Sequence, residues 1–302
     1  MVLSGVKKFL NNPASRFKFL NRHNKWMSDE AYLKKLYYYR VGKTLNLDNP
    51  QTFNEKIQWL KLYDRKPVYT TMVDKYEAKK YVADIIGEEY IIPTLGVWDR
   101  FEDIDFDKLP EQFVLKCTHD SGGLVICRDK ASFNKEAAAK RINKCLKKNY
   151  YLDNREWPYK DVKPRIIAEE FLTEAGKEQG LADYKIWCFN GKPVYVQYIT
   201  SRTAGEPTEG FYDRNWQLQK FRYHNPLMEQ ALPRPKELEK LLELAEVLAQ
   251  NTAFLRCDFY VPEENTIKFG ELTFYPVSGM EFWHPEEMDE VLGAMISLPE
   301  RE

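Results

Sequence analysis

Residues 254–275 (FLRCDFYVPEENTIKFGELTFY) carry four polar side chains at regular spacing in an otherwise apolar stretch. Both halves are rich in Phe, Tyr, Leu and Val, as strands are, and the polar PEEN between them is typical of a turn. A tight turn there would place Asp258 opposite Glu271. Two residues further along each strand, it would place Arg256 opposite Thr273. Because residues two apart share a face of a strand, we expect all four side chains on one surface.

Two carboxylates placed opposite each other point to the chemistry of this surface. Like charges directly across a pair of strands repel each other unless something positive lies between them. Asp258 and Glu271 therefore indicate a bound cation, and oxygen-only ligands favour Mg²⁺ over zinc. The alternative is an exposed sheet face on which Arg256 bridges two surface acids, and such ion pairs contribute little to stability.

Two lysines upstream have the setting of phosphate-binding groups. Lys116 ends the apolar run FVLK, and the polar, glycine-containing loop CTHDSGG follows it. Backbone N–H groups and an ammonium group can hold phosphate oxygens together, although the Walker A pattern GxxxxGK[ST] is absent. Lys75 lies at the start of a helix predicted over 74–86, where a cation opposes the helix dipole and a nearby anion would explain it. The alternative is that both lysines are simply exposed.

A third group of polar residues follows the apolar run of IIAEEFL. Glu169 and Glu170 end that run, and Glu174 lies four residues on. A carboxylate and strand-end backbone groups, such as those of Leu172, could receive the amino group and ring nitrogens of adenine, while another acid holds the ribose hydroxyls. Solvated acids at a strand end are an equally open alternative.

A hairpin with an Asn190-Gly191 turn comes next, and this dipeptide is a strong signal for a two-residue hairpin turn. Asp183, Lys185 and Trp187 share one face of its first strand. Lys185 would give the phosphate site a third lysine.

Helices alternating with hairpins must position these side chains. Thr52 and Glu55 form a capping-box pattern at the start of one predicted helix. Helical periodicity predicts helices at 28–40, 52–65, 74–86, 132–151, 235–250 and 285–296. Repeated βαβ units are missing from the pattern, so the sequence predicts an antiparallel α+β fold.

The composition is that of a globular protein of one large or two ordinary domains. The chain has 302 residues, 43% of them hydrophobic and 14% aromatic, and a net charge of −1 that gives no argument for a nucleic-acid partner. Its five cysteines are isolated and odd in number, without a CxxC pair, which favours buried free thiols over disulfides or zinc ligands.

Residues 1–27 hold six Lys or Arg and no acid, interleaved with Phe, Leu and Trp. Such a basic amphipathic segment could touch an anionic membrane surface, and the alternative is a solvated helix packed by its apolar side. No apolar run reaches the ~20 residues needed to span a bilayer, and the start lacks a signal-peptide core. We therefore expect a cytoplasmic location, with peripheral contact at the inner membrane if this segment binds lipid.

The order and spacing of these elements are more specific than any single motif. NPQTFNEKIQWLKLYDR, DKYEAKKYV, FVLKCTHDSGG, DYKIWCFNGKP and FGELTFYP, spread over about residues 45–280, resemble the TupA-like ATP-grasp proteins of bacterial surface-polysaccharide gene clusters. The resemblance implies two α+β subdomains that clasp ATP, at 71–172 and 173–302, the second with a magnesium-binding hairpin. Residues 1–70 would be a basic, helical N-terminal extension.

The resemblance also implies a role for each matching residue. ATP would contact Lys75, Lys116, His119, Ser121, Gly122, Gly123, Glu169, Glu170, Leu172, Glu174 and Asp183. Mg²⁺ would be held by Asp258, Glu271 and Thr273, while Arg256 faces the reacting acyl phosphate and Lys185 binds phosphate or the substrate carboxylate. Two features depart from the family pattern. Thr273 stands where many ATP-grasp ligases carry Asn as the further metal ligand, and THDSGG replaces an Asn-His-Gly-type loop.

The activity that the resemblance implies is ATP-dependent ligation of a carboxylate to an amine through an acyl phosphate. The acid would be a uronic acid of a capsular or cell-wall glycan, and the amine an amino acid or small amino alcohol. Aromatic side chains that could stack on sugars are Trp187, Tyr195, Tyr198, Tyr212, Trp216 and Trp283.

Two other functions are open from the sequence. The first is a glycosyltransferase in which Asp103, Asp105 and Asp107 of DIDFD hold a metal-bound sugar nucleotide. The second is a nucleotide- or glycan-binding protein without turnover, which the unusual Thr273 would suit.

Overall fold

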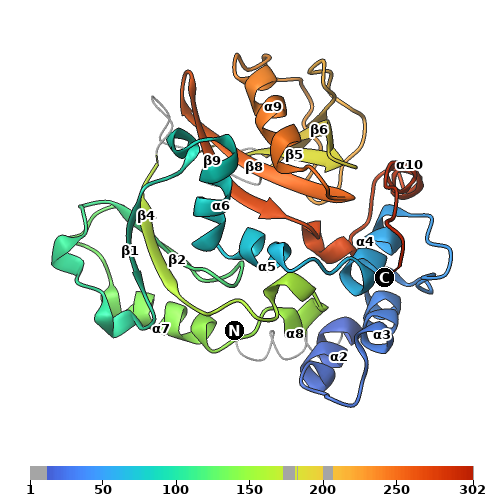
Figure 1. The fold of residues 1–302 in the computed structure, drawn as a ribbon, viewed down its shortest axis with the longest axis horizontal. Coiled ribbons are helices and arrows are strands. Elements are labelled where there is room, and N and C mark those ends of the chain that lie inside the picture. The colour runs from blue at the N-terminus through green and yellow to red at the C-terminus, as the bar shows by residue number, and fades with distance from the viewer. Residues whose placement is uncertain (1–11, 173–180, 182, 200–206, 302) are drawn as a thin grey trace.

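Two separate antiparallel sheets form the framework of the computed structural model, which describes residues 12–172, 181, 183–199 and 207–301 (Figure 1). The first sheet has the spatial order β1-β4-β2-β3, with β1 at Thr94–Trp98, β2 at Phe113–Cys117, β3 at Leu124–Cys127 and β4 at Ile166–Glu170. The second has the order β7-β6-β5-β8-β9, with β5 at Asp183–Phe189, β6 at Lys192–Ile199, β7 at Glu209–Tyr212, β8 at Phe254–Glu263 and β9 at Thr266–Thr273. The predicted antiparallel α+β class is confirmed.

The register of the β8–β9 hairpin is the predicted one. Asp258 pairs with Glu271 and Arg256 pairs with Thr273. The turn has Asn265 at φ 63°, a left-handed value that Asn tolerates better than most residues. The β5–β6 turn likewise holds Asn190-Gly191 at positive φ, as a two-residue hairpin turn requires.

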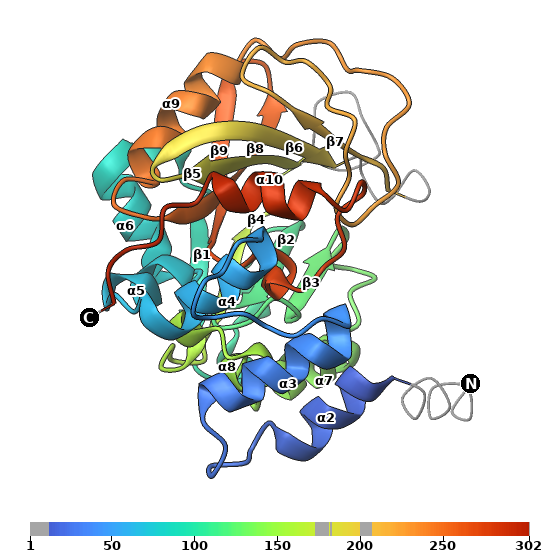
Figure 2. The same cartoon turned by 90° about the vertical axis from the view of Figure 1, so that its right-hand side faces the viewer.

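Helices lie at both ends of the chain and between the strands (Figure 2). They are α2 (Pro13–Asn21), α3 (Asp29–Val41), α4 (Phe53–Tyr63), α5 (Val68–Val73), α6 (Glu77–Ile86), α7 (Lys135–Leu146), α8 (Tyr151–Asn154), α9 (Leu238–Leu248) and α10 (Met288–Ala294). Short 3₁₀ turns include η2 (Phe101–Asp103), η3 (Phe106–Lys108), η4 (Trp157–Tyr159) and η6 (Pro276–Gly279). The capping box of Thr52 and Glu55 is present at the start of α4.

Helix α6 begins three residues later than the sequence predicts. Asp74 accepts hydrogen bonds from the backbone N–H groups of Tyr76 and Glu77, while the backbone N–H of Lys75 donates to the Thr118 carbonyl oxygen at 3.0 Å. Lys75 is thus held beside the loop after β2, and α6 begins two residues after this contact.

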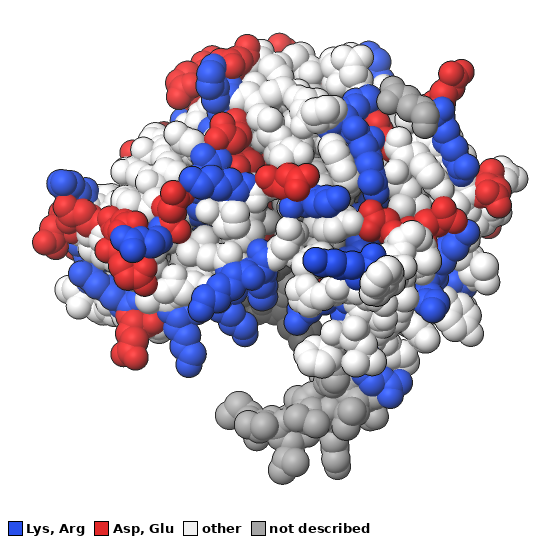
Figure 3. Space-filling view, turned by 60° about the horizontal axis from the view of Figure 1, so that its bottom comes forward, with Lys and Arg blue, Asp and Glu red and all other residues white. Residues whose placement is uncertain are grey.

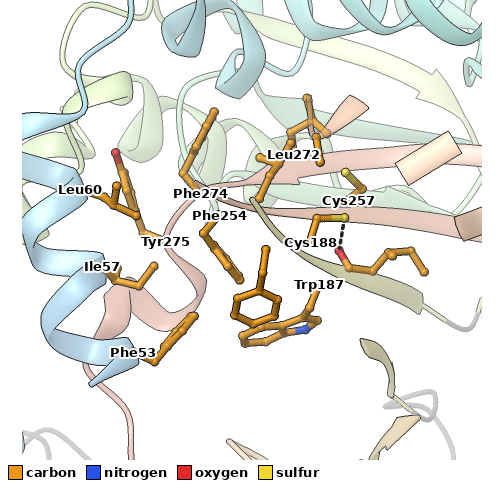
Figure 4. Packing of buried hydrophobic residues seen from close by; sticks show 14 of the residues in the cluster. Phe53, Ile57, Leu60, Trp187, Cys188, Phe254, Cys257, Leu272, Phe274 and Tyr275 are labelled. Atoms are coloured by element: carbon orange, nitrogen blue, oxygen red, sulfur yellow. Dashed lines mark hydrogen bonds between the residues drawn. The ribbon is translucent and has the colours of Figure 1, made fainter. Parts of the chain in front are cut away.

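The larger hydrophobic core joins the second sheet to the N-terminal helices. On one sheet face, the Cys188 and Cys257 thiols lie against the Ala245 carbonyl of α9. On the other face, Phe53 of α4 packs between Trp187 and Phe254 (Figure 4). A smaller core lies between the first sheet and α7. The predicted division into 1–70, 71–172 and 173–302 stays a prediction.

The cysteines and most of the sugar-stacking candidates are interior residues. All five cysteines are free and buried, as predicted, and burial raises the pKa of Cys117 to about 12. Four of the six candidate stacking residues are also buried: Trp187, Tyr212, Trp216 and Trp283. Only Tyr195 and Tyr198 keep partial exposure, so core packing accounts for most of this aromatic content.

Candidate active site

Glu169 on β4 is the centre of a charged cluster on the first sheet. It is 5% exposed, and its two carboxylate oxygens accept from two different lysines. Lys116 Nζ of β2 lies 2.5 Å from Oε2, and Lys79 Nζ of α6 lies 2.6 Å from Oε1. Register places Lys116 opposite Ile167, so Lys116 and Glu169 share one face of the sheet.

Charge balance in this cluster keeps the carboxyl ionised. Burial alone would raise the pKa of Glu169, but Lys116 and Lys79 outweigh it and hold the pKa below the ordinary 4.5. Burial lowers the pKa of Lys79 against the opposing effect of Glu169. Lys79 also donates to the Ile92 carbonyl at 2.5 Å, so its ammonium group has two acceptors.

Lys75 lies next to this cluster and is fixed at both ends. Its Nζ donates to the Asp120 carbonyl oxygen at 2.5 Å. Arg165 holds the flanking residues, because its Nη2 donates to Asp74 at 2.7 Å and to Glu77 at 2.8 Å. The structure thus brings Lys75 to the glycine-containing loop, as the sequence predicts.

The loop after β2 is organised by its own side chains. Asp120 accepts from the Gly123 backbone N–H at 2.9 Å, and Ser121 Oγ donates to the Tyr150 hydroxyl at 3.2 Å. His119 is buried, and its Nε2 lies 3.2 Å from the Cys145 carbonyl. A Cβ at position 123 would lie 2.5 Å from the Cys117 sulfur, so only glycine fits there. Ser121 and Gly122 are exposed, while the His119 ring points into the protein.

Asp258 on β8 is the centre of a second charged cluster. Its side chain is 2% exposed and accepts two hydrogen bonds from Arg256, both at 2.7 Å, and one from Lys185 at 2.6 Å. Lys185 lies directly across from Asp258 in the sheet and also contacts Asp183 at 3.3 Å. The carboxyl pKa is raised by burial but lowered further by Arg256 and then Lys185, so it stays below the ordinary 3.8.

Glu271 and Thr273 are the oxygen donors next to Asp258. Glu271 has a side chain 42% exposed, with one oxygen 3.5 Å from Arg256 Nη2. Thr273 Oγ1 lies 3.5 Å from Glu271 and accepts from Arg256 at 3.1 Å. Asp258 is committed to its cations, and no cluster of three or more His, Cys, Asp or Glu forms among the described residues. The predicted magnesium site therefore stays a prediction, and Glu271 is its most accessible oxygen donor.

One pocket lies between the Glu169 cluster and Glu271 of β9, and Asp258, Arg256 and Lys185 do not line it. Its lining residues come from both sides of a cleft: Met72, Val73, Lys75, Ala78, Lys79, Ile92, Lys116, Tyr159, Glu169, Phe269, Gly270, Glu271 and Leu272. Four of them, Lys75, Lys116, Glu169 and Glu271, are predicted site residues. Lys79 and Tyr159 are the additions that the structure makes. No local pattern pointed to Lys79, because Lys75 lies before the first residue of α6 and shares no helical turn with it.

The remaining predicted residues are less central. Glu170 lies on the other face of β4 and lines a separate groove with Phe171 and Arg128, whose guanidinium carbon is 5.0 Å from the Phe171 ring centre. Leu172 follows the end of β4 and is half-buried. Glu174 lies outside the described residues.

The acids of DIDFD do not converge. Asp103 pairs with Arg100, and Asp105 pairs with Lys108 at 3.2 Å, each within its own short turn. Asp107 is exposed and donates its backbone N–H to Asp105. Nothing in this arrangement resembles a site for a metal-bound sugar nucleotide.

The fold, with its two antiparallel sheets and a lysine-lined pocket, is that of the ATP-grasp class. The family described as TupA-like ATPgrasp matches residues 55–297, and this chain belongs to it. The match begins within α4 and ends beyond α10.

The solved structures that the chain matches share little sequence with it. D-alanine–D-alanine ligase from Bacillus anthracis, complexed with ATP, is 16% identical with a TM-score of 0.39, over 68% of this chain and 54% of its own. A RimK domain ATP-grasp protein from Sphaerobacter thermophilus is 13% identical with a TM-score of 0.42, over 78% and 70%. The D-cycloserine synthetase DcsG is 12% identical with a TM-score of 0.41, over 76% and 71%. The chain thus spans about half the length of the first of these, and no curated protein matches its sequence.

Proposed function

We propose that this chain joins a carboxylate to an amine at the expense of ATP, with Mg²⁺ as a second cofactor. The observation that carries the proposal is the pocket in which Lys75 and Lys116 face Glu271 across the cleft. Ammonium groups suit phosphate oxygens and carboxylates suit Mg²⁺, so one pocket offers both halves of a Mg-ATP site. Membership of the ATP-grasp family supports the same activity.

The reaction requires two bond exchanges and no covalent link to the protein. A carboxylate oxygen attacks the γ-phosphorus, the bond from that phosphorus to the β,γ-bridging oxygen breaks, and ADP leaves. The amine nitrogen then attacks the acyl carbon, the bond from this carbon to the phosphate oxygen breaks, and the nitrogen loses a proton to solvent. The protein mainly has to position groups and neutralise charge. The buried, unreactive cysteines fit a reaction without a protein nucleophile.

On the first-sheet side, the lysines bind the phosphates. Lys75 and Lys116 would contact phosphate oxygens under the loop 119–123. Glu169 has both oxygens engaged by lysines, so it orients Lys79 and Lys116 in this state. Glu169 would contact the adenine amino group only if one of these lysines left it for a phosphate oxygen. Strand-end groups at Glu170 and Leu172 would receive the rest of the base.

On the second-sheet side, Asp258, Glu271 and Thr273 would hold Mg²⁺. When bound, the ion supplies neutralisation of the charge on the transferring phosphoryl group. Arg256 is almost fully buried and held by Asp258, so its charge has a fixed position. In the proposed reaction it would face the acyl phosphate. Lys185 would bind phosphate or the substrate carboxylate from the next strand.

Nucleotide binding tests the magnesium assignment. In calorimetric titrations with ATP, the variants Asp258→Asn and Glu271→Gln should each lose at least about tenfold of the affinity that Mg²⁺ adds. Asp105→Asn is a matched control, because Asp105 is exposed and pairs only with its own turn. If both site variants bind Mg-ATP like the parent, the ligands are assigned wrongly.

Turnover tests the reaction itself. The parent is supplied with Mg-ATP, a uronic-acid glycan and candidate amines, and ADP release and product mass are followed. An amide product with one ADP per bond supports the ligase. Absence of ADP release with every acid and amine would overturn it.

The substrate part of the proposal is a uronic acid of a capsular or cell-wall polysaccharide, with an amino acid or small amine as the nucleophile. Family membership supports it. Tyr195 and Tyr198 are the candidate sugar platforms that keep some exposure, on a strand next to β5. Mass analysis of the glycan from a deletion strain should show loss of the amide-linked substituent, and an unchanged glycan would contradict this assignment.

We further propose peripheral contact with the inner membrane surface through residues 1–27. Phe19 is 61% exposed, Leu20 75% and Trp26 98%, and the exposed Arg16 and Lys25 lie close to them in sequence. Figure 3 views the molecule from below and shows both basic and acidic side chains spread over this face. No helix among the described residues is both long and apolar enough to span a membrane. Apolar tips surrounded by cations suit an anionic lipid surface.

Vesicle sedimentation tests the membrane proposal. The parent should pellet with vesicles of phosphatidylglycerol mixed with phosphatidylcholine, and much less with phosphatidylcholine alone. Combined Phe19→Ser, Leu20→Ser and Trp26→Ser substitutions should abolish pelleting. Phe282→Ser with Val291→Ser is the matched control, since these side chains are 50% and 44% exposed near α10. Equal pelleting of both variants would exclude this surface.

A further inference from the structure

Lys61 of α4 is a fully buried lysine for which the ligase chemistry has no use. Its Nζ donates to Gln58 Oε1 at 2.9 Å. It also donates to Ser278, in the turn after β9, at 2.7 Å to the carbonyl oxygen and 2.8 Å to Oγ. A further contact reaches the Asn154 carbonyl at 3.3 Å. A buried ammonium group is costly unless it is hydrogen-bonded, so these acceptors explain how it is tolerated.

The charge of Lys61 is balanced by groups from several elements. Burial lowers its pKa to about 7, the buried carboxylate of Glu156 just before η4 opposes this, and Arg40 of α3 and Lys18 of α2 add to the lowering. Glu156 itself interacts with Ser278 and Asn154. Two opposite charges from distant parts of the chain therefore meet at Ser278.

The turn that they contact has an unusual backbone. Val277, Ser278 and Gly279 all have positive φ, at 44°, 61° and 59°. For a β-branched residue such as Val277 this is a strained conformation that persists only where the surroundings enforce it. Glycine is required at position 279, because a Cβ there would lie 2.3 Å from Ile57 Cγ2 of α4.

Side chains from two directions hold the turn in place. Gln58 Nε2 of α4 donates to the Ser278 carbonyl at 3.0 Å and to the Gly279 carbonyl at 2.7 Å. Tyr223 donates its hydroxyl to the Pro276 carbonyl at 2.7 Å. Together with Lys61, these bonds take up the carbonyl groups that a strained turn would otherwise leave buried without partners.

This turn follows directly on the strand of the active site. Glu271 and Thr273 are the proposed magnesium ligands near the end of β9, and Phe274 and Tyr275 then enter the core beside Ile57 and Leu60 (Figure 4). We infer that Lys61 and Gln58 are positioning residues, which fix the turn 276–279 and thereby the direction in which Glu271 and Thr273 face the cleft. The inference rests on the proposed ligase function for its effect on turnover.

The test combines hydrogen exchange with kinetics. Lys61→Met alone leaves Glu156 buried without its counter-charge, so the double variant Lys61→Met/Glu156→Gln is measured beside it. Backbone exchange of the peptide covering 270–280 should rise at least about tenfold in either variant that folds. The kcat for ADP formation should fall about tenfold or more, with the KM for ATP within about threefold of the parent.

Two further substitutions keep the result interpretable. Lys56→Met removes another partly buried lysine of α4, which donates to the Ile296 carbonyl and not to the turn, so exchange at 270–280 should match the parent. Val277→Gly relieves the positive-φ strain without touching Lys61, but it removes a side chain that packs against the core and gives the unfolded chain more freedom. These effects oppose each other, so the midpoint of thermal unfolding should change little while kcat falls.

Each outcome has one meaning. Unchanged exchange at 270–280 and unchanged kcat in the double variant overturn the inference, and so does raised exchange with unchanged kcat. If the parent releases no ADP with any acid and amine while exchange rises in the variants, the ligase proposal fails. The inference that Lys61 fixes the turn 276–279 would still stand.

Discussion

Each of the two sheets carries a buried carboxylate that is shared between two cations. Asp258 is bound by Arg256 and Lys185, which come from its own strand and the next. Glu169 is bound by Lys116 from a neighbouring strand and by Lys79 from helix α6. The Asp258 cluster lies within one sheet, whereas the Glu169 cluster joins a sheet to a helix.

The difference lies in how easily the cations can leave. Arg256 makes a two-pronged bond to Asp258 and its side chain is 11% exposed. Lys116 makes one contact and is 21% exposed at the edge of the pocket. A planar guanidinium is held in one geometry, whereas an ammonium on a flexible stem can turn to a new partner. We infer that the cations bound to Asp258 stay in place, whereas the lysines bound to Glu169 can turn to an incoming phosphate.

The largest expected effect is on the fixed cluster. Asp258→Asn leaves Arg256 and Lys185 buried without their counter-charge, and breaking a buried pair in this way costs about 3–5 kcal/mol. Urea unfolding followed by circular dichroism measures the loss. Glu271→Gln is the control on the same sheet face, expected within about 1 kcal/mol because its side chain is half exposed. A loss below that of the control would show that the cations are free to rearrange.

Glu169→Gln should cost less, about 1–3 kcal/mol, although the carboxylate is equally buried. The released Lys116 can reach water in the pocket, so one cation is not trapped. The same unfolding experiment measures it. A loss equal to that of Asp258→Asn would show that the cations around Glu169 are as firmly held as those around Asp258.

Acid should weaken the contribution of both clusters to stability. Both carboxyls have a pKa below their ordinary values of 4.5 for Glu169 and 3.8 for Asp258. Each therefore stabilises the fold fully above the ordinary value, and the contribution is lost as pH falls through the lower pKa of the folded state. The stability difference between the parent and Glu169→Gln should stay constant down to about pH 4.5 and shrink below it. A difference that grows on acidification would contradict the direction of the shift.

The smallest effects are expected outside both clusters. Asp103→Asn and Asp105→Asn remove exposed acids that pair within their own turns, so neither the unfolding midpoint nor ADP formation should change measurably. Loss of turnover in either variant would revive a catalytic role for DIDFD.

The sequence predicts the Asp258 cluster better than the Glu169 cluster for a physical reason. Strand alternation and a turn between two paired strands determine the neighbours of Asp258, and both can be recognised in one stretch of chain. Lys79 meets Glu169 only because α6 packs against the first sheet, which no local pattern specifies. Glu170 could have been excluded from the site by strand alternation, because adjacent residues of β4 face opposite sides of the sheet.

Lys61 was beyond prediction from local pattern. A lysine in an amphipathic helix is normally expected on the solvent face. Its partner Ser278 is 217 residues away in sequence, in a turn whose left-handed backbone depends on contacts from α4. The helix itself, with its capping box, was predictable; what it holds was not.

The contact between α4 and α10 also constrains the order of events during synthesis. Both the backbone N–H and the side-chain amide of Asn54 donate to Asp289, 235 residues later. Gly293 lies so close that a Cβ there would be 2.1 Å from the Gln51 carbonyl. A helix that leaves the ribosome early must therefore wait for nearly the whole chain before its partner exists. Until then its apolar face, including Phe53 and Ile57, is exposed to chaperones and to other nascent chains.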